Sequence, residues 1–153
     1  MDFNSKTTLD FLKSFAKSMY ENTNYEPESA AMYQKAADEG RTVGIVENIK
    51  TGPFTKGSII TTIVNNQGVC RNFAGMGNVM LSELGIESEI GMSVKAGHIF
   101  LRVQIQQTPY IVDPTNGDVM SEQEFYNVWK IDDAVYTPGF FTSQCPLGVC
   151  HNR

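Results

Sequence analysis

The sequence lacks the features that would place it in a membrane or on a nucleic acid. No stretch approaches the roughly 20 apolar residues that a membrane-spanning helix needs. Residues 1–15 (MDFNSKTTLDFLKSF) have no basic segment followed by an apolar run, so they do not resemble a standard export signal. No run of Lys and Arg occurs, and the formal net charge is −5, which argues against a nucleic-acid partner or an anionic membrane. We expect a protein that stays in the cytoplasm, leaves by a signal-independent route, or is part of a larger chain.

Cysteine and histidine are both scarce in this chain. Three cysteines cannot form an even disulfide framework. Cys145 and Cys150, within CPLGVCH, leave three alternatives open, which are a disulfide-closed loop, half of a metal site or two free thiols. No four ligands occur at zinc-type spacing, so we expect neither a metal nor a cofactor. Cys70 remains as a lone thiol, and His98 is the only histidine outside the final three residues.

The length and composition fit one folded domain. A chain of 153 residues can bury a hydrophobic core without staples such as disulfides. Its hydrophobic content of 41% and charged content of 19% are those of a globular protein. Repeats, low-complexity tracts and evident linkers are absent from the sequence. We therefore predict a single α+β domain, with helices first and an antiparallel sheet second.

The first part of the chain favours helices. Apolar residues recur at helical intervals, and residues that suit helix ends stand at the boundaries. The segment KGSIITTIV has the β-branched content of a strand, but its apolar residues fall at helical spacing, so we favour a helix there. Helices are thus predicted for residues 7–21, 27–40 and 58–64, whereas residues 41–49 fit either a strand or a helix.

The clearest helical pattern begins at a cysteine. Helical spacing gathers one apolar face from Cys70, Phe73, Ala74, Gly77, Leu81 and Leu84. Gly85 follows this face directly and suits the left-handed conformation that ends many helices. Cys70 is therefore predicted to lie in the first turn of the helix and on its core-facing side.

Alternating apolar residues follow this helix and predict antiparallel strands. Ser121 and Glu124 then have the spacing of a capping box that opens a short helix ending at Trp129. From Ile131 onward, proline and glycine interrupt the chain, and we predict loops. The predicted strands cover residues 90–94, 98–105 and 110–113, with a turn over residues 106–109.

Cys70, His98 and Asp113 supply the three groups of a thiol-based catalytic triad. The thiolate is the nucleophile, and an ordinary cysteine with a pKa of about 8.5 is mostly protonated at neutral pH. A helix start favours negative charge, and a nearby imidazole can take the thiol proton. A carboxylate on the other ring nitrogen fixes the tautomer. We predict that Cys70 is the nucleophile, His98 the general base and then acid, and Asp113 the residue that orients the imidazole.

The distances along the chain from His98 and Asp113 to the turn near Gln107 are unequal. Directly opposed pairing of these two residues is therefore not dictated by the sequence. Either a β-bulge or a longer first strand would bring them together, and both alternatives stay open.

An oxyanion site needs donors beside the nucleophile. The backbone N–H of Cys70 is one predicted donor, because it lies at a helix start. Asn65, Asn66 and Gln67 precede it, and we predict Gln67, the nearest of the three, as the second donor. Polar residues before a glycine also fit an ordinary loop.

Four short motifs stand in order around the three candidate residues. They are G-x-C at a helix start, L-G-I, G-H-x-F-L-x-V and Y-I-V-D-P-T, in residues 68–70, 84–86, 97–103 and 110–115. Their order resembles the transglutaminase-like superfamily of cysteine enzymes. The resemblance implies a papain-like α+β core, a Cys-His-Asp triad and acyl transfer at an amide of a protein or peptide through a thioester. The acyl acceptor is then water, in proteolysis or deamidation, or an amine, in cross-linking.

Some features depart from the large cross-linking members. Arg71 stands where an aromatic residue often follows the nucleophile in those enzymes, and no flanking β-domain or calcium-loop pattern is present. A core of this size resembles bacterial peptidases, toxin domains and injected effectors that deamidate glutamine. We predict glutamine deamidation or transamidation of a protein ahead of peptide cleavage.

The predicted domain spans residues 1–153, with a helical part over 1–57, a catalytic core over 58–130 and a loop-rich tail over 131–153. Rival hypotheses are a cysteine peptidase of the same fold, a binding module without activity, or a buried core thiol with an accidental resemblance. The intact set of three residues disfavours the inactive module.

Overall fold

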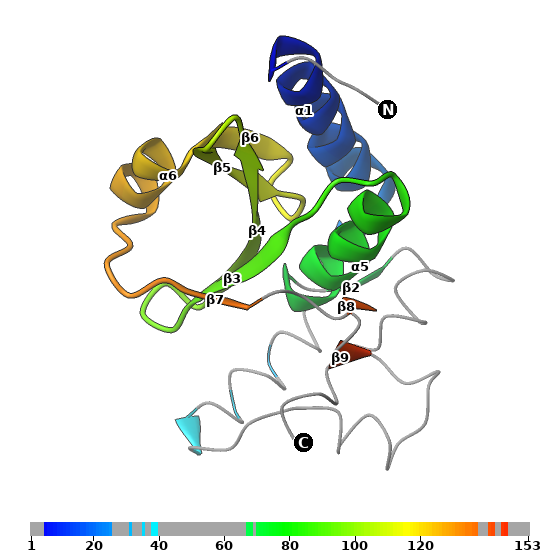
Figure 1. Cartoon of the computed structure of the whole chain (residues 1–153). Coiled ribbons are helices and arrows are strands. Elements are labelled where there is room, and N and C mark those ends of the chain that lie inside the picture. The colour runs from blue at the N-terminus through cyan, green and yellow to red at the C-terminus, as the bar shows by residue number, and fades with distance from the viewer. Residues whose placement is uncertain are drawn as a thin grey trace.

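In the computed structural model of the chain, an antiparallel sheet lies between helices. The structure describes residues 5–25, 31, 35, 38–39, 67–68, 70–137, 141–142 and 145–146. The five strands lie in the order β6-β5-β4-β3-β7. They are β3 (Glu89–Ser93), β4 (His98–Ile105), β5 (Thr108–Asp113), β6 (Asp118–Ser121) and β7 (Val135–Thr137). Figure 1 shows helices α1 (Ser5–Asn22) and α5 (Cys70–Glu83) on one side of the sheet and α6 (Glu122–Trp129) on the other. The predicted α+β class is confirmed.

Short strand pairs lie outside this sheet. β1 (Asn24–Tyr25) pairs in parallel with β2 (Gln67–Gly68), which places Tyr25 beside Gly68 just before α5. β8 (Phe141–Thr142) pairs with β9 (Cys145–Pro146). Among the described residues, no helix is long and apolar enough to cross a membrane.

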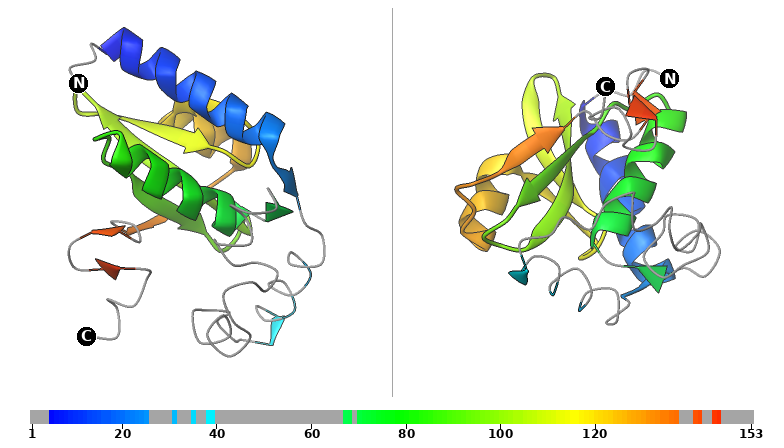
Figure 2. Two further views of the ribbon diagram at one scale, coloured as in Figure 1. Left: turned by 90° about the vertical axis from the view of Figure 1, so that its right-hand side faces the viewer. Right: turned by 90° about the horizontal axis from the view of Figure 1, so that it is seen from below.

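The central strand β4 divides the core between the two faces of the sheet. Side chains alternate along a strand, so the even and odd positions of β4 face different helices. One face packs on α1 and α5, whose axes run across it side by side (Figure 2). Its buried apolar residues are Leu12, Phe15, Ala16, Met19, Phe73, Ala74, Leu81, Leu101, Val103, Ile105 and Val112. The other face packs on α6 through Phe100, Ile111, Phe125 and Ile131.

Helix α5 has the start and end that its sequence predicts. It begins at Cys70, and Gly85 beyond its end has a φ of 78°. The Gly85 N–H donates to the Ser82 carbonyl, and the Ile86 N–H donates to the Leu81 carbonyl, which is the bonding of a Schellman cap. On the core side, a Cβ at Gly77 would lie 3.0 Å from the Leu101 side chain, so this glycine permits close packing of α5 on the sheet.

The helices at the two ends of the described core follow their predicted bounds. α1 begins two residues before, and ends one residue after, the predicted range 7–21. α6 ends at Trp129, as predicted, and the Ser121 side chain accepts a hydrogen bond from the Glu124 N–H at its start. This capping contact saturates one of the free donors at the helix N-terminus.

Within the five-stranded sheet, two strands are not predicted from the sequence. The sequence predicts loop after Ile131, but β7 pairs with the outer edge of β3. β6, which pairs with β5, is not predicted either. Both strands are short, so neither shows a usable alternation, and their pairing partners fix them instead. The predictions for residues 27–40, 41–49 and 58–64 and for Cys150 lie largely or wholly outside the described residues.

The hairpin between β4 and β5 turns through two glutamines in a left-handed conformation. Gln106 has a φ of 50° and Gln107 a φ of 68°, and Ile105 pairs with Thr108 across the turn. This conformation costs residues other than glycine roughly 1 kcal/mol, and Asn followed by Gly is the preferred pair.

The double substitution of Gln106→Asn and Gln107→Gly is therefore expected to stabilise the fold by about 1–2 kcal/mol. Urea denaturation of the double variant should show a higher midpoint at an unchanged slope. Gln104→Asn, on the adjoining exposed strand position, is the matched control and should not raise the midpoint. An unchanged midpoint in the double variant would contradict backbone strain at this turn.

Candidate active site

Cys70 lies at the N-terminus of α5, where unpaired backbone N–H groups and the helix dipole favour negative charge. The residue is a free cysteine and is partly exposed. Strand β2 lies just before Cys70 in the chain, and its pairing with β1 brings Tyr25 close to the start of α5. Cys70 is therefore both accessible and placed in a setting that suits a thiolate.

His98 and Asp113 are joined by a hydrogen bond between neighbouring strands. Their Nε2 and Oδ2 atoms lie 2.7 Å apart, and the two side chains are 6% and 1% exposed. The ladder pairs Leu101 with Val112, so its register places Asp113 opposite Phe100 and on the same face as His98. β4 extends past the end of β5 in a regular ladder. Of the two alternatives left open by the sequence, the longer first strand is the one observed.

The Asp113 carboxylate is held by donors from the turn that follows it. Its Oδ1 accepts from the Thr115 N–H at 3.1 Å, and its Oδ2 accepts from the Asn116 side-chain amide at 2.9 Å. The Gly117 N–H also donates to the Asp113 carbonyl at 2.8 Å, which closes the turn. The carboxylate thus stays directed at Nε2 of His98. This leaves Nδ1 as the ring nitrogen available to Cys70.

Electrostatic interactions favour a charged His98. Burial lowers the pKa of the imidazole, but hydrogen bonding to Asp113 and to Cys70 outweighs it and raises the pKa to about 9. At neutral pH the imidazole is therefore protonated, in the form that pairs with a thiolate. The pKa of the neighbouring Tyr25 is also raised, first by the burial of its own side chain and second by the charge of Cys70.

Aromatic rings surround the imidazole. The indole of Trp129 stacks on it with ring centroids 4.6 Å apart and planes 10° apart. Phe100 and Phe125 approach it at 6.0 and 6.4 Å in tilted arrangements. Trp129 and Phe125 both belong to α6, so the helix on the second face of the sheet brings two aromatic rings to the imidazole.

A pocket of about 370 Å³ opens over Cys70 and His98, two of the three predicted residues. Cys70 and His98 line it together with Tyr25, Trp129 and the turn residues Ala96, Gly97, Thr115 and Asn116. The wall at Ala96 is fixed by hydrogen bonds, because its N–H donates to Ser93 Oγ, and Ser93 Oγ donates to Asp133 at 2.6 Å. A reacting group in this pocket would lie beside both the thiol and the imidazole.

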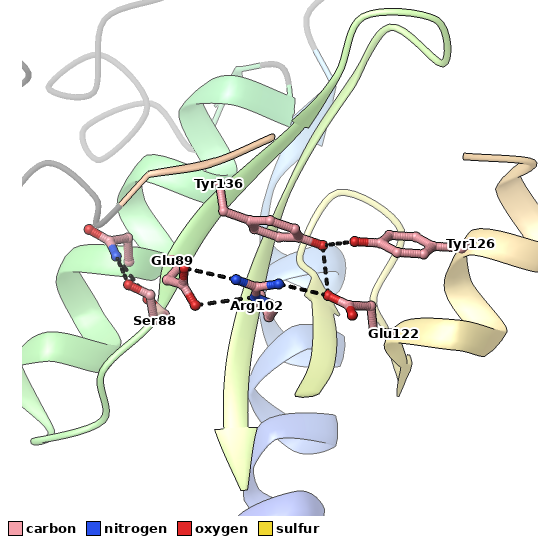
Figure 3. A network of polar contacts seen from close by, with 7 residues as sticks. Ser88, Glu89, Arg102, Glu122, Tyr126 and Tyr136 are labelled. Atoms are coloured by element: carbon pink, nitrogen blue, oxygen red, sulfur yellow. Dashed lines mark hydrogen bonds and ion pairs between the residues drawn. The ribbon is translucent and has the colours of Figure 1, made fainter. Parts of the chain in front are cut away.

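A second polar cluster anchors α6 to the sheet on the face that carries His98. Arg102 binds Glu89 through two hydrogen bonds and Glu122 through a third, and its guanidinium lies 3.5 Å from the centre of the Tyr136 ring (Figure 3). The Tyr136 hydroxyl bonds Glu122 and Tyr126. The cluster therefore connects β3, β4, β7 and α6.

The structure brings Cys70, His98 and Asp113 to one place, while their catalytic roles stay predictions. The side chain of Gln67, the predicted second oxyanion donor, lies outside the described residues. Trp129, Asn116 and Tyr25 are site residues that the sequence does not predict. Trp129 is the only tryptophan of the chain and Asn116 follows Asp113 by three positions, but neither signal specifies a contact. Among the described residues, no group of three or more His, Cys, Asp or Glu side chains is placed to hold a metal ion.

Comparisons with known proteins give a family match and several structural likenesses, of which two are described. A family model described as a transglutaminase-like domain matches residues 1–138. No curated protein matches the sequence significantly. Legionella pneumophila LapG is similar in structure, with 16% sequence identity and a TM-score of 0.47 over 84% of this chain and 62% of its own. EGTA-treated LapG from the same organism gives 16% identity and a TM-score of 0.44, over 86% and 61%. The chain thus spans less than two thirds of the length of these solved chains.

Proposed function

The chain belongs to the transglutaminase-like domain family, and from this premise we propose that it is a cysteine-dependent acyl-transfer enzyme acting on amide bonds. The proposed substrate is the carboxamide of a glutamine side chain in a protein. The observation that carries the proposal is the buried hydrogen bond of 2.7 Å between His98 and Asp113, together with the pocket that His98 and Cys70 line. These residues supply a nucleophile, a proton carrier and an orienting carboxylate.

The first half-reaction forms a thioester. The Cys70 thiolate attacks the carboxamide carbon, and the carbonyl electrons move to oxygen. The backbone N–H of Cys70 and the side chain of Gln67 are the proposed oxyanion donors. When the carbon–nitrogen bond breaks, the protonated His98 gives its Nδ1 proton to the departing nitrogen, which leaves as ammonia.

The second half-reaction releases the product. Neutral His98 removes a proton from water or from an amine, which then attacks the thioester carbon. The carbon–sulfur bond breaks and restores the thiolate and the imidazolium. Water gives a glutamate side chain, and an amine gives a cross-linked amide. Throughout both steps, Asp113 keeps Nε2 bound so that Nδ1 faces the reaction.

The test is a mass measurement on glutamine-containing proteins and peptides, with and without a primary amine. Exchange of the side-chain NH₂ for OH is expected, and the amine adduct is expected when the amine is added. Peptide fragments in place of these products would assign the same pocket to a cysteine peptidase. If a broad substrate panel gives no deamidated product, no amine adduct and no peptide fragment, and Cys70 is also unreactive, the proposal is contradicted.

The pH dependence of thiol reactivity follows from the direction of the His98 shift. The ion pair needs a protonated imidazole, and the pKa of His98 is raised from 6.5 to about 9. Iodoacetamide should therefore label Cys70 rapidly at mildly acidic pH, where a cysteine in an unfolded peptide is unreactive. Folding stability moves in the same sense, because the His98 contribution is fully present below pH 6.5 and is lost as the pH rises through 9.

His98→Ala is the informative variant for this measurement. Without the imidazole, labelling of Cys70 at mildly acidic pH is expected to fall about 10²-fold or more, to the rate of an ordinary thiol. Labelling that is no faster than in the unfolded peptide, and that is unchanged in His98→Ala, would contradict an activated thiolate.

A further inference from the structure

We propose that Trp129 is a positioning residue that stabilises the protonated imidazole of His98 through its stacked indole ring. The proposal deepens the function proposed above and rests on it, because it assigns the control of the His98 charge to a residue outside the triad. It starts from the stacking geometry, with centroids 4.6 Å apart and planes 10° apart.

The edges and the faces of the imidazole have separate partners. In the ring plane, Nε2 bonds Asp113, and Nδ1 is the nitrogen left for Cys70. Only the faces of the ring remain, and the indole covers one of them. A cation within about 6 Å of an aromatic centroid is attracted by the ring quadrupole, and tryptophan gives the strongest attraction of the natural side chains. The indole therefore favours the charged imidazole without competing for either nitrogen.

The indole is held in place from both ends of α6. At the helix start, Glu122 bonds Arg102 and Tyr136, as seen in Figure 3. In the middle, Phe125 is fully buried. After the helix end, the Ile131 N–H donates to the Tyr126 carbonyl. Because these contacts fix the helix before a substrate binds, the stack is preorganised.

The ionisable groups around His98 come from the other elements of the site. Asp113 faces it from β5, Cys70 from α5, and Tyr25 of β1 lines the same pocket. Asp118 of β6 is paired with Asp113 of β5 across the sheet. Burial of Asp118 and the charge of Asp113 raise the pKa of Asp118. From α6, the rings that approach the imidazole are Trp129 and Phe125, which do not ionise. An effect of the indole on the charge of His98 is therefore not confused with the titration of either α6 side chain that contacts the imidazole.

The test replaces the indole with fluorinated indoles. Trp129 is the only tryptophan of the chain, so biosynthetic incorporation of fluorotryptophans changes this site alone. Ring fluorines withdraw electron density from the face of the indole and leave its shape nearly unchanged. With increasing fluorination, the titration of His98, followed by NMR, should move stepwise to lower pH, by about half a unit to one unit in total. His151, in the final three residues, supplies an internal reference.

Two variants extend the series. Trp129→Phe keeps an aromatic face with a weaker quadrupole, and Trp129→Leu removes the aromatic face. The pH at which His98 titrates in Trp129→Phe should therefore lie between its values in wild type and in Trp129→Leu. Val128→Ala, at the adjacent exposed position of α6, is the matched control and should leave the His98 titration unchanged. An identical His98 titration in the native and fully fluorinated proteins would overturn the proposal, and this comparison does not depend on whether Trp129→Leu folds.

The Cys70→Ala protein separates this inference from the proposed function. It cannot carry out the chemistry, but it keeps the stacked pair, so fluorination should still shift its His98 titration. A shift in this protein, combined with absence of product from the wild type, would leave the inference standing and remove the proposed reaction. No shift in this protein, combined with normal product formation by the wild type, would do the opposite.

Discussion

Cys70→Ala is expected to reduce product formation on the order of 10⁵-fold, which brings it close to the uncatalysed rate. The change removes the atom that forms the thioester, and neither His98 nor Asp113 can replace it. The measurement is a single-turnover assay on a glutamine peptide, with the thioester trapped by acid and detected by mass. Wild type should show the adduct, and Cys70→Ala should show none.

The substitution is well suited to isolate chemistry from folding. Cys70 is only partly buried, and alanine is a strong helix former at the first position of α5. The thermal midpoint should therefore change little. Cys145→Ala, a matched change in the same chain, should keep full activity. Activity that survives Cys70→Ala would contradict the assignment of Cys70 as the nucleophile and, with it, the whole proposed mechanism.

Local sequence patterns are sufficient to predict the helix that begins at Cys70 and the strand that begins at His98. The apolar face beginning at Cys70, and Gly85 after it, define α5 because helical periodicity and capping are local properties. The alternation beginning at His98 defines β4 in the same way. The family resemblance, drawn from motifs between residues 68 and 115, is confirmed by the family match over residues 1–138.

Contacts between distant segments escape these patterns. In sequence, Trp129 is simply the last residue of a helix, and its stack on His98 arises only when α6 packs on the far face of the sheet. The sequence predicts loop at β7 because three residues show no alternation, while its Tyr136 ring lies against Arg102 from another strand. The register of His98 with Asp113 likewise depends on strand lengths that the sequence leaves open.

Asp113→Asn is expected to lower the rate of acylation by about 10³–10⁴-fold while leaving the fold intact. The carboxylate accepts hydrogen bonds from Thr115 N–H and from the Asn116 amide, and it bonds Nε2 of His98. An asparagine can offer its oxygen to Thr115, but its NH₂ group then faces His98. The NH₂ group donates a hydrogen bond to Nε2, so the neutral imidazole must carry its proton on Nδ1. In that tautomer Nδ1 cannot take the thiol proton of Cys70.

The same change should weaken the charged form of His98, because the bond to Asp113 is a principal cause of its raised pKa. The pKa of His98 should fall from about 9 toward its ordinary value, so the high-pH limb of activity moves to lower pH. Asn116→Ala is the matched control. It removes one donor but keeps the carboxylate, so the tautomer stays correct and the rate should fall about tenfold at most. Equal losses in Asp113→Asn and Asn116→Ala would mean that the turn geometry, and not the charge of Asp113, sets the state of His98.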